Sequence, residues 1–176
     1  MDLFLVVLGG RIKGCNIELH DVRWVVGETI EDTISDLKQQ WIGQRKGLHI
    51  DSYRRIRFAD GHHVAVNLKP AATNPAKDKL WFVNLGAYDP SDMAERHRFG
   101  FVVARSPQAA KARAKRLWLK GLNSVHKDDL HPVEGQTAID DLLPIEGTRR
   151  WSVDLKPMET MERENEKPDW YGYRLI

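Results

Sequence analysis

Residues 3–26 read LFLVVLGGRIKGCNIELHDVRWVV, and residues 80–103 repeat their pattern as LWFVNLGAYDPSDMAERHRFGFVV. At an offset of 77 the match continues without a gap to residues 53 and 130, and 12 of the 51 aligned positions are identical. Segments of ordinary composition would share about 3 identities by chance. The identities include rare residue types, namely Trp41 with Trp118 and His20 with His97. The chain therefore contains a tandem duplication.

Each repeat opens with two predicted strands. The first is a continuous apolar run, at residues 3–8 and again at 80–85, and short runs of this kind are typical of covered strands. Each run ends at a glycine that predicts a turn, Gly9 or Gly86. The second strand is predicted over residues 22–26 and 99–103.

A helix is predicted next in both repeats, because cap residues occur at the same repeat position. Thr29 and Ser106 have hydroxyls that can accept a backbone N–H, and Pro107 suits the first helical position. An apolar face at helical spacing follows in each helix. The predicted faces are Ile30, Ile34, Leu37 and Trp41 in the first, and Ala110, Ala114, Leu117 and Trp118 in the second. Gly43 and Gly121 supply the stops.

The last part of each repeat predicts two more strands. Residues 53–68 form an expected hairpin around the turn Asp60-Gly61. Its ending, Val66 to Pro70, matches Val153 to Pro157 at an offset of 87, so the second copy carries about ten extra residues. We expect them at Thr137–Pro144, as a short helix ended by proline.

These patterns predict an α+β fold of two tandem ββαββ repeats, related by a pseudo-twofold axis, with sheets covered by helices. Repeat 1 is expected over residues 1–72 and repeat 2 over 80–157. The tail, residues 158–176, follows, and its segment Trp170 to Tyr173 is a candidate last strand. We expect the repeats to form one compact body.

The composition is that of an ordinary soluble globular protein. Of the 176 residues, 41% are hydrophobic and 30% charged, and the net charge of +2 is too small to indicate a polyanionic partner. Cys15 is the single cysteine, which excludes an intramolecular disulfide and a cysteine-based zinc site. We expect a cytoplasmic protein, since no stretch approaches the roughly 20 apolar residues of a membrane span.

The first repeat resembles a bacterial family known as a domain of unknown function, number 1543. The residues that carry the resemblance are Leu8-Gly9-Gly10, Asn16 to Val22, Val25-Val26-Gly27, Glu31-Asp32-Thr33 and Leu48 to Tyr53. In the second repeat, Phe82 to Gly86 and Tyr88-Asp89-Pro90 look like the same family. The resemblance implies a domain present once or twice per chain. It implies no activity, cofactor or catalytic residue.

Four polar residues of each repeat are the candidate functional site. They form a Glu-x-His motif after the first strand and a His-x-Asp motif after the helix, and the predicted arrangement brings both to the same end of the sheet. The two sets are Glu18, His20, His49 and Asp51, and Glu95, His97, His126 and Asp128.

Three interpretations of these sets remain open. They could tie loops to strand ends, because residues kept in both halves of a duplication often serve the fold. They could hold Zn²⁺ or Mn²⁺, since imidazole and carboxylate are ligands of both. They could also supply a general acid and base near neutral pH.

Other features suggest weaker hypotheses. The second helix carries a basic face of Lys111, Arg113, Lys115, Arg116 and Lys120, which could contact nucleic acid or an acidic helix of the same chain or of a second copy. Nucleic-acid binding is disfavoured, because the first helix is acidic and no aromatic RNA-binding motif accompanies the second.

A phosphate loop and a reactive thiol are also disfavoured. The glycines 9, 10 and 14 lead into a strand, so no helix N-terminus would face an anion. Cys15 is matched by Asp92 in the second copy, which indicates an incidental thiol. Trp41 and Trp118 end the apolar helix faces and are expected in the core.

The sequence thus predicts a small binding or interaction protein without catalysis, with a protein or small molecule as its partner and a homodimer as one possible form. The alternative is a hydrolase or metal-dependent enzyme built on the Glu-x-His and His-x-Asp motifs. No cofactor is specified.

Overall fold

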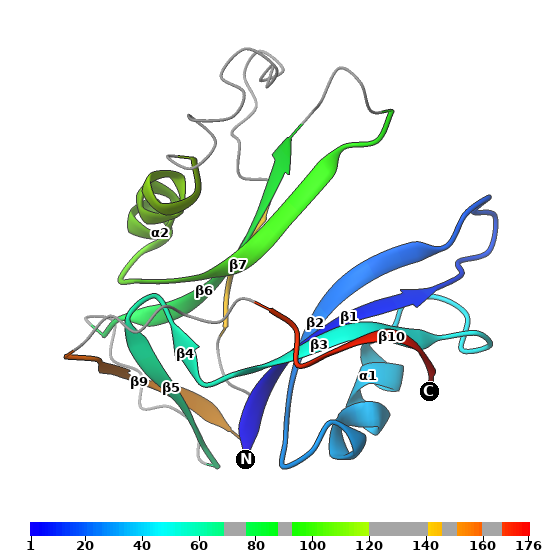
Figure 1. The fold of residues 1–176 in the computed structure, drawn as a ribbon, viewed down its shortest axis with the longest axis horizontal. Helices are drawn as coiled ribbons and strands as arrows, with labels where there is room; N and C mark the ends of the chain where they lie inside the picture. The colour runs from blue at the N-terminus through cyan, green and yellow to red at the C-terminus, as the bar shows by residue number, and fades with distance from the viewer. Residues whose placement is uncertain (69–76, 88–92, 120–140, 146–150, 160–166) are drawn as a thin grey trace. The chain divides into compact units, whose positions relative to one another are not determined.

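The computed structural model describes residues 1–68, 77–87, 93–119, 141–145, 151–159 and 167–176 (Figure 1). The strands of this part of the chain are β1 (Asp2–Gly10), β2 (Leu19–Gly27), β3 (His49–Ile56), β4 (Phe58–Ala59), β5 (His62–Asn67), β6 (Lys79–Ala87), β7 (Arg96–Ala104), β8 (Asp141–Pro144), β9 (Ser152–Pro157) and β10 (Trp170–Leu175). The helical segments are a 3₁₀ turn (Glu31–Thr33), α1 (Ile34–Gln40), α2 (Pro107–Ala114) and a π-helical turn (Lys115–Leu119).

The predicted α+β class with helix-covered ββαββ repeats is wrong, because the described residues are mostly β-sheet. The strands of each opening hairpin are 9 residues long, whereas α1 has 7 residues and α2 has 8. A helix rises about 1.5 Å per residue and a strand about 3.3 Å, so helices this short span only a fraction of the sheet beside them. Among the described residues, no helix has the length and apolar character to cross a membrane.

Two compact units make up the chain. Unit 1 comprises Met1–Phe58, His63–Val66 and Glu159–Ile176, and unit 2 comprises Ala59–His62 and Asn67–Met158. A three-stranded sheet has the order β4–β5–β9. That the repeats form one compact body stays a prediction.

Unit 1 is built on an antiparallel sheet in the order β10–β3–β1–β2, with α1 on one side of it (Figure 1). Alternate residues of β1, Phe4, Val6 and Leu8, pack in one core cluster with Leu37 of α1 and with Trp41. Because side chains alternate along a strand, Gly9 lies on the opposite face. The predicted last strand is present as β10, which pairs with β3.

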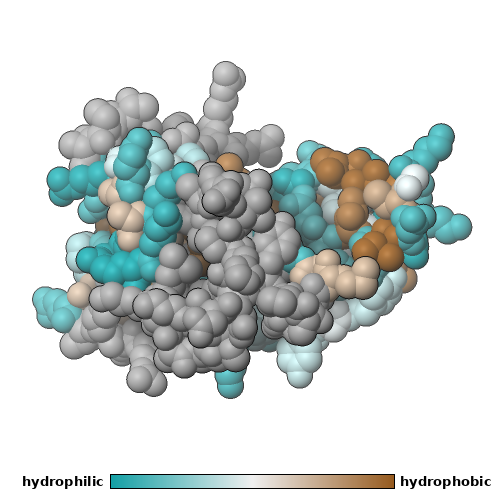
Figure 2. Space-filling view, turned by 90° about the horizontal axis from the view of Figure 1, so that it is seen from above, coloured by the Kyte–Doolittle hydropathy of each residue, from teal (hydrophilic) through white to brown (hydrophobic). Residues whose placement is uncertain are grey.

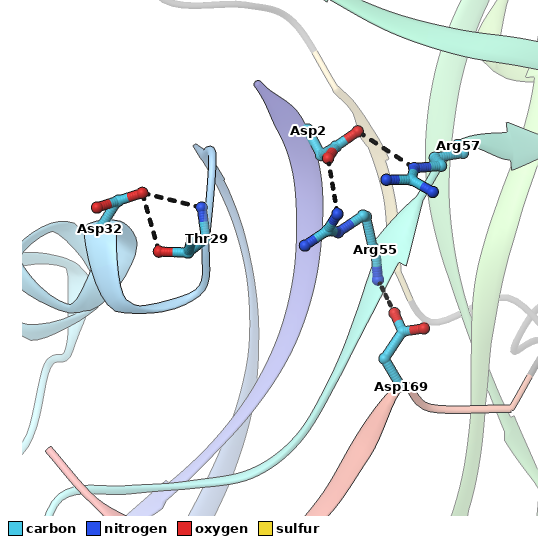
Figure 3. Close-up of polar contacts among 6 residues, drawn as sticks. All are labelled: Asp2, Thr29, Asp32, Arg55, Arg57 and Asp169. Atoms are coloured by element: carbon cyan, nitrogen blue, oxygen red, sulfur yellow. Dashed lines mark hydrogen bonds and ion pairs between the residues drawn. The ribbon is translucent and has the colours of Figure 1, made fainter.

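The helical segment of unit 1 begins differently from the prediction. Asp32 accepts hydrogen bonds from the backbone N–H and the hydroxyl of Thr29, each at 2.9 Å, as the acidic partner of a capping box does (Figure 3). These bonds, the backbone one first, hold the pKa of Asp32 below its usual range. The chain first makes the 3₁₀ turn, and α1 starts only at Ile34.

Charged side chains link three strands of unit 1 (Figure 3). Asp2 of β1 lies 3.2 Å from Arg55 of β3 and 3.5 Å from Arg57. The backbone N–H of Arg55 also donates to Asp169, immediately before β10, at 2.5 Å. Pairs this exposed contribute little stability each, so their effect is chiefly to favour one arrangement of strands.

Unit 2 confirms the offset found in the sequence. Its sheet has the order β7–β6–β8, and α2 packs against it. Gly9 pairs with His20 in unit 1, and Gly86 pairs with His97 in unit 2, so the two opening hairpins share one register at an offset of 77. Ser106 caps α2 as predicted, because its hydroxyl accepts the N–H of Ala109.

Two further predictions for the second copy are wrong. Of the expected helix at 137–144, residues 141–144 form β8, and the remainder lies outside the described residues. Leucine and proline side chains suit an edge position beside β6, where Pro144 needs no ladder N–H. Leu117, expected in the core, is 44% exposed, because the turn after α2 is π-helical and rotates the apolar face away.

A buried ion pair joins the turn at Asp60 to α2 within unit 2. Asp60 has φ = 49° in the predicted Asp-Gly turn, and its side chain is 5% exposed. Its carboxylate accepts two hydrogen bonds from the Arg113 guanidinium and one, at 2.8 Å, from the N–H of Val103. Arg113, predicted as part of a basic binding face, therefore serves the fold.

We expect Arg113→Ala to lower the free energy of unfolding by about 2 kcal/mol, because it leaves a buried carboxylate without its counter-charge. Arg116→Ala is the control on the same helix, since Arg116 is exposed and should change stability by less than about 0.5 kcal/mol. Urea denaturation measures both. Equal effects of the two substitutions would contradict the assignment.

Candidate functional site

The polar quartet of the first repeat comes together at one end of the unit 1 sheet. Glu18 directly precedes β2, His20 lies in β2, and His49 and Asp51 lie in β3. The strand between them is β1, and its residue Gly9 pairs with His20 on one side and with His49 on the other. Paired residues of antiparallel strands project to the same face, so both imidazoles lie across Gly9, opposite α1.

Asp51 lies on the same face, at a β-bulge in β3. Val7 pairs with Ser52 and Leu8 pairs with Ile50, which leaves Asp51 as an extra residue in β3. Regular alternation would send residues 49 and 51 to one face and 50 and 52 to the other. His49 and Asp51 therefore share a face by ordinary alternation, and the bulge brings Ser52, the partner of Val7, to that face as well.

Each of the two carboxylates lies within ion-pair distance of each of the two imidazoles. Asp51 Oδ2 is 3.1 Å from His20 Nε2, and Asp51 Oδ1 is 3.3 Å from His49 Nε2. Glu18 is 3.8 Å from His20 Nε2 and 3.9 Å from His49 Nε2. One ligand atom from each of Glu18, His20 and His49 falls within 4.8 Å of the other two.

His49 is the buried member of the cluster. Its side chain is 2% exposed, whereas His20 is 52% exposed and Glu18 43%. Nδ1 of His49 lies 2.8 Å from the Gly47 carbonyl oxygen, which can only accept, so Nδ1 carries a proton. The ring of Tyr173, in β10, packs on the imidazole with centroids 4.1 Å apart.

Gly9 is required by the position of His49. A Cβ at residue 9 would lie 2.4 Å from His49 Nε2 and 3.0 Å from Asp51 Oδ2. On the other face, a Cβ at Gly10 would lie 2.8 Å from the Trp41 ring. The two glycines belong to β1, so the predicted turn at Gly9 is wrong. Because the two glycines lack side chains, the rings of His49 and Trp41 can pack closely against β1. The hypothesis of a phosphate loop has no structural support.

Half of the second quartet lies within the described residues. Glu95 Oε2 is 3.7 Å from His97 Nε2, and Nδ1 of His97 is 3.1 Å from the side-chain nitrogen of Asn84. His126 and Asp128 lie outside the described residues, as does Lys120 of the predicted basic face.

The two copies also differ in the strand pairing of β8. In unit 2, Asp141 pairs with Asn84. Asn84 is the repeat equivalent of Val7, which pairs with Ser52 in unit 1. His49 precedes Ser52 by three residues in the sequence, whereas His126 precedes Asp141 by fifteen. Within the described residues, the strand of unit 2 that pairs with β6 therefore comes from a later part of its repeat than β3 does.

The remaining candidates lie outside this cluster. Cys15 is an exposed free thiol. Trp41 packs in the unit 1 core, and its indole N–H donates to the carbonyl of Gln44 at 3.1 Å. Lys115 and Arg116 are exposed on the turn after α2, and Lys111 is half-buried.

The chain is a β-sheet protein with two copies of one domain, and comparison with known proteins identifies its family. The family described as Domain of Unknown Function (DUF1543) matches residues 15–66 and 92–153, and the chain belongs to it. This confirms the resemblance seen in the sequence and the presence of the domain in two copies.

A crystal structure of the protein Il1583 from Idiomarina loihiensis is also similar, with a TM-score of 0.72 and 31% sequence identity. The match covers 99% of this chain and 97% of that one. The comparison with curated proteins gives no match.

A double-mutant cycle tests the close approach at Gly9. We expect Gly9→Ala to lower the free energy of unfolding by about 1–3 kcal/mol, because the new methyl group overlaps the buried imidazole. In a His49→Ala background the same change should cost at least about 1 kcal/mol less. Gly10→Ala is the control, since it meets Trp41 and should cost the same in both backgrounds. Equal costs of Gly9→Ala in the two backgrounds would contradict the contact.

Proposed function

We propose that unit 1 is a metal-binding module and that Glu18, His20 and His49 hold a divalent transition-metal ion. The observation that carries this proposal is the convergence of one ligand atom from each residue within 4.8 Å. Two motifs about thirty residues apart in the sequence supply these atoms, and the pairing of both strands with β1 brings them together.

The electrostatics of the cluster favour a cation at its centre. Because Nδ1 of His49 faces the Gly47 carbonyl, Nε2 is the ring nitrogen that faces Asp51 and Glu18. A lone pair and two carboxylates repel one another unless a proton or a metal ion lies among them. A metal ion satisfies all of these atoms at once.

The environment of His49 resembles that of a metal ligand. Histidines that bind metals commonly donate their second ring N–H to a backbone carbonyl, which fixes the tautomer and the direction of the ring. The Gly47 carbonyl has this position, and burial between Gly9 and Tyr173 further restricts the ring. Two imidazoles with a carboxylate suit Zn²⁺ best, and Mn²⁺ less well.

The role we propose is binding without catalysis, in a cytoplasmic protein. The alternative is a hydrolase, and the observation that favours it is the number of ligands: catalytic zinc sites commonly have three protein ligands and an open position. A homodimer and a protein or small-molecule partner stay predictions.

Titration calorimetry of chelator-treated protein with ZnCl₂ tests the proposal. We expect one ion per chain at unit 1, and a loss of affinity of at least about 100-fold for His49→Ala, because removing a ligand leaves too few donors. His63→Ala is the control, since His63 is an exposed histidine of unit 1 that contacts Phe58 and lies outside the cluster.

Absence of zinc binding by the wild-type protein would refute the proposal. So would equal losses for His49→Ala and His63→Ala, which would indicate adventitious binding by surface histidines. His97→Ala distinguishes zinc binding at unit 2 from binding at unit 1, because it should leave the affinity of the unit 1 site unchanged.

A further inference from the structure

We infer that Asp51 is the fourth ligand of a closed tetrahedral zinc site, and that the ion clamps the end of the β1–β2 hairpin to β3. This inference rests on the proposed metal binding and goes further, because it assigns the metal geometry and with it a structural role. The argument uses the distances among the ligand atoms, the bulge in β3 and the burial of the Asp51 carboxylate.

The distances match a tetrahedron. Ligand atoms about 2.0–2.1 Å from a tetrahedral zinc ion lie about 3.3 Å from one another. Asp51 Oδ2 lies 3.1 Å from His20 Nε2 and Asp51 Oδ1 lies 3.3 Å from His49 Nε2, so a small rotation of the carboxylate brings one oxygen toward both nitrogens. The contacts of Glu18 with the same nitrogens, 3.8 Å and 3.9 Å, need only a small contraction, which its exposed side chain permits.

The Asp51 carboxylate lacks a partner that a metal would supply. Oδ2 is buried and accepts no hydrogen bond from any described residue, although His20 Nε2 is 3.1 Å away. A buried carboxylate oxygen without a hydrogen-bond donor is unfavourable for folding. The bulge at Asp51 also interrupts the β1–β3 ladder, and a bond to zinc offsets both costs.

Residues around His49 enclose the buried side of the cluster. Tyr173 covers one face of the His49 ring, and the backbone of Gly9 lies against its Nε2 edge. Ile17 and Leu19 flank Glu18 and His20 in the sequence and are exposed, at 75% and 38%. Apolar side chains also gather over the β1 and β2 part of unit 1, at the right of Figure 2. Four protein ligands would complete the tetrahedral shell and leave no position for a reactive water.

A closed site excludes two other uses of the cluster. Mg²⁺ and Ca²⁺ prefer six or more oxygen ligands, so two imidazoles disfavour them. Hydrolysis needs a metal-bound water, which a fourth protein ligand replaces. The ion instead crosslinks residues from β2 and β3 on either side of β1.

Cobalt substitution tests the geometry. Tetrahedral Co²⁺ absorbs visible light far more strongly than six-coordinate Co²⁺, so the intensity per bound ion reports the number of ligands. We expect strong absorption from the wild-type protein titrated with CoCl₂. Asp51→Ala should reduce the intensity several-fold and weaken Zn²⁺ binding by about 10–100-fold.

Asp21→Ala is the matched control. Asp21 is an aspartate of β2 next to His20, its carboxylate pairs with Arg23, and neither residue belongs to the cluster. We expect its cobalt spectrum and its zinc affinity to equal those of the wild type.

The outcomes separate the two proposals. Cobalt bound by the wild type with weak absorption, unchanged in Asp51→Ala, would overturn the closed site and leave a three-ligand metal site. Failure of the wild type to bind either ion would overturn both. The wild-type spectrum separates four-coordinate from six-coordinate metal, and Asp51→Asn, which keeps the shape of the side chain, tests the fourth ligand if Asp51→Ala does not fold.

Discussion

The packing of the His49 imidazole against the bare backbone of Gly9 is the contact on which unit 1 depends. β1 is the central strand, and at its end it carries two glycines whose missing side chains make room for a ring on each face. His49 occupies one face and Trp41 the other. The polar cluster and the apolar core therefore share a single strand end, and a shift of that strand would disturb both.

The two units share a scaffold and differ at its edge. Each has a central strand paired with its neighbour in the same register, and each packs a short helix on the sheet. The third strand differs. In unit 1 it is β3, which follows α1 closely and supplies His49 and Asp51, whereas in unit 2 it is β8, a strand of four residues. Within the described residues, the two copies thus differ in the strand that supplies His49 and Asp51 in unit 1.

Much of the fold was predictable from short-range signals. The apolar runs, the Ser106 cap and the Asp60-Gly61 turn depend on neighbouring residues, and the structure has all of them. The fold class was not predictable in this way, because cap residues mark where a helix starts but not how soon tertiary packing ends it. The π-helical turn after α2 also has no clear sequence signal.

The candidate site was predictable in its members but not in its geometry. Repeated Glu-x-His and His-x-Asp motifs pointed to Glu18, His20, His49 and Asp51, and the strand pairing brings these four together. The bulge at Asp51 has no signature in the sequence. Nor does the sequence show that Gly9 lacks a side chain so that the His49 ring can pack against it. The identity of His126 with His49 records common ancestry at a fixed offset, whereas strand pairing follows the register of β8.

The edge strand β10 has a consequence for the order in which the protein is made. It pairs with β3 through contacts such as the bond from the N–H of Ile176 to the carbonyl of Leu48, and it places Tyr173 on His49. Yet the ribosome adds these residues only after the whole of unit 2. Unit 2 can fold during synthesis, but the sheet of unit 1 must wait with its β3 edge open, so the first half of the chain is the last to be completed.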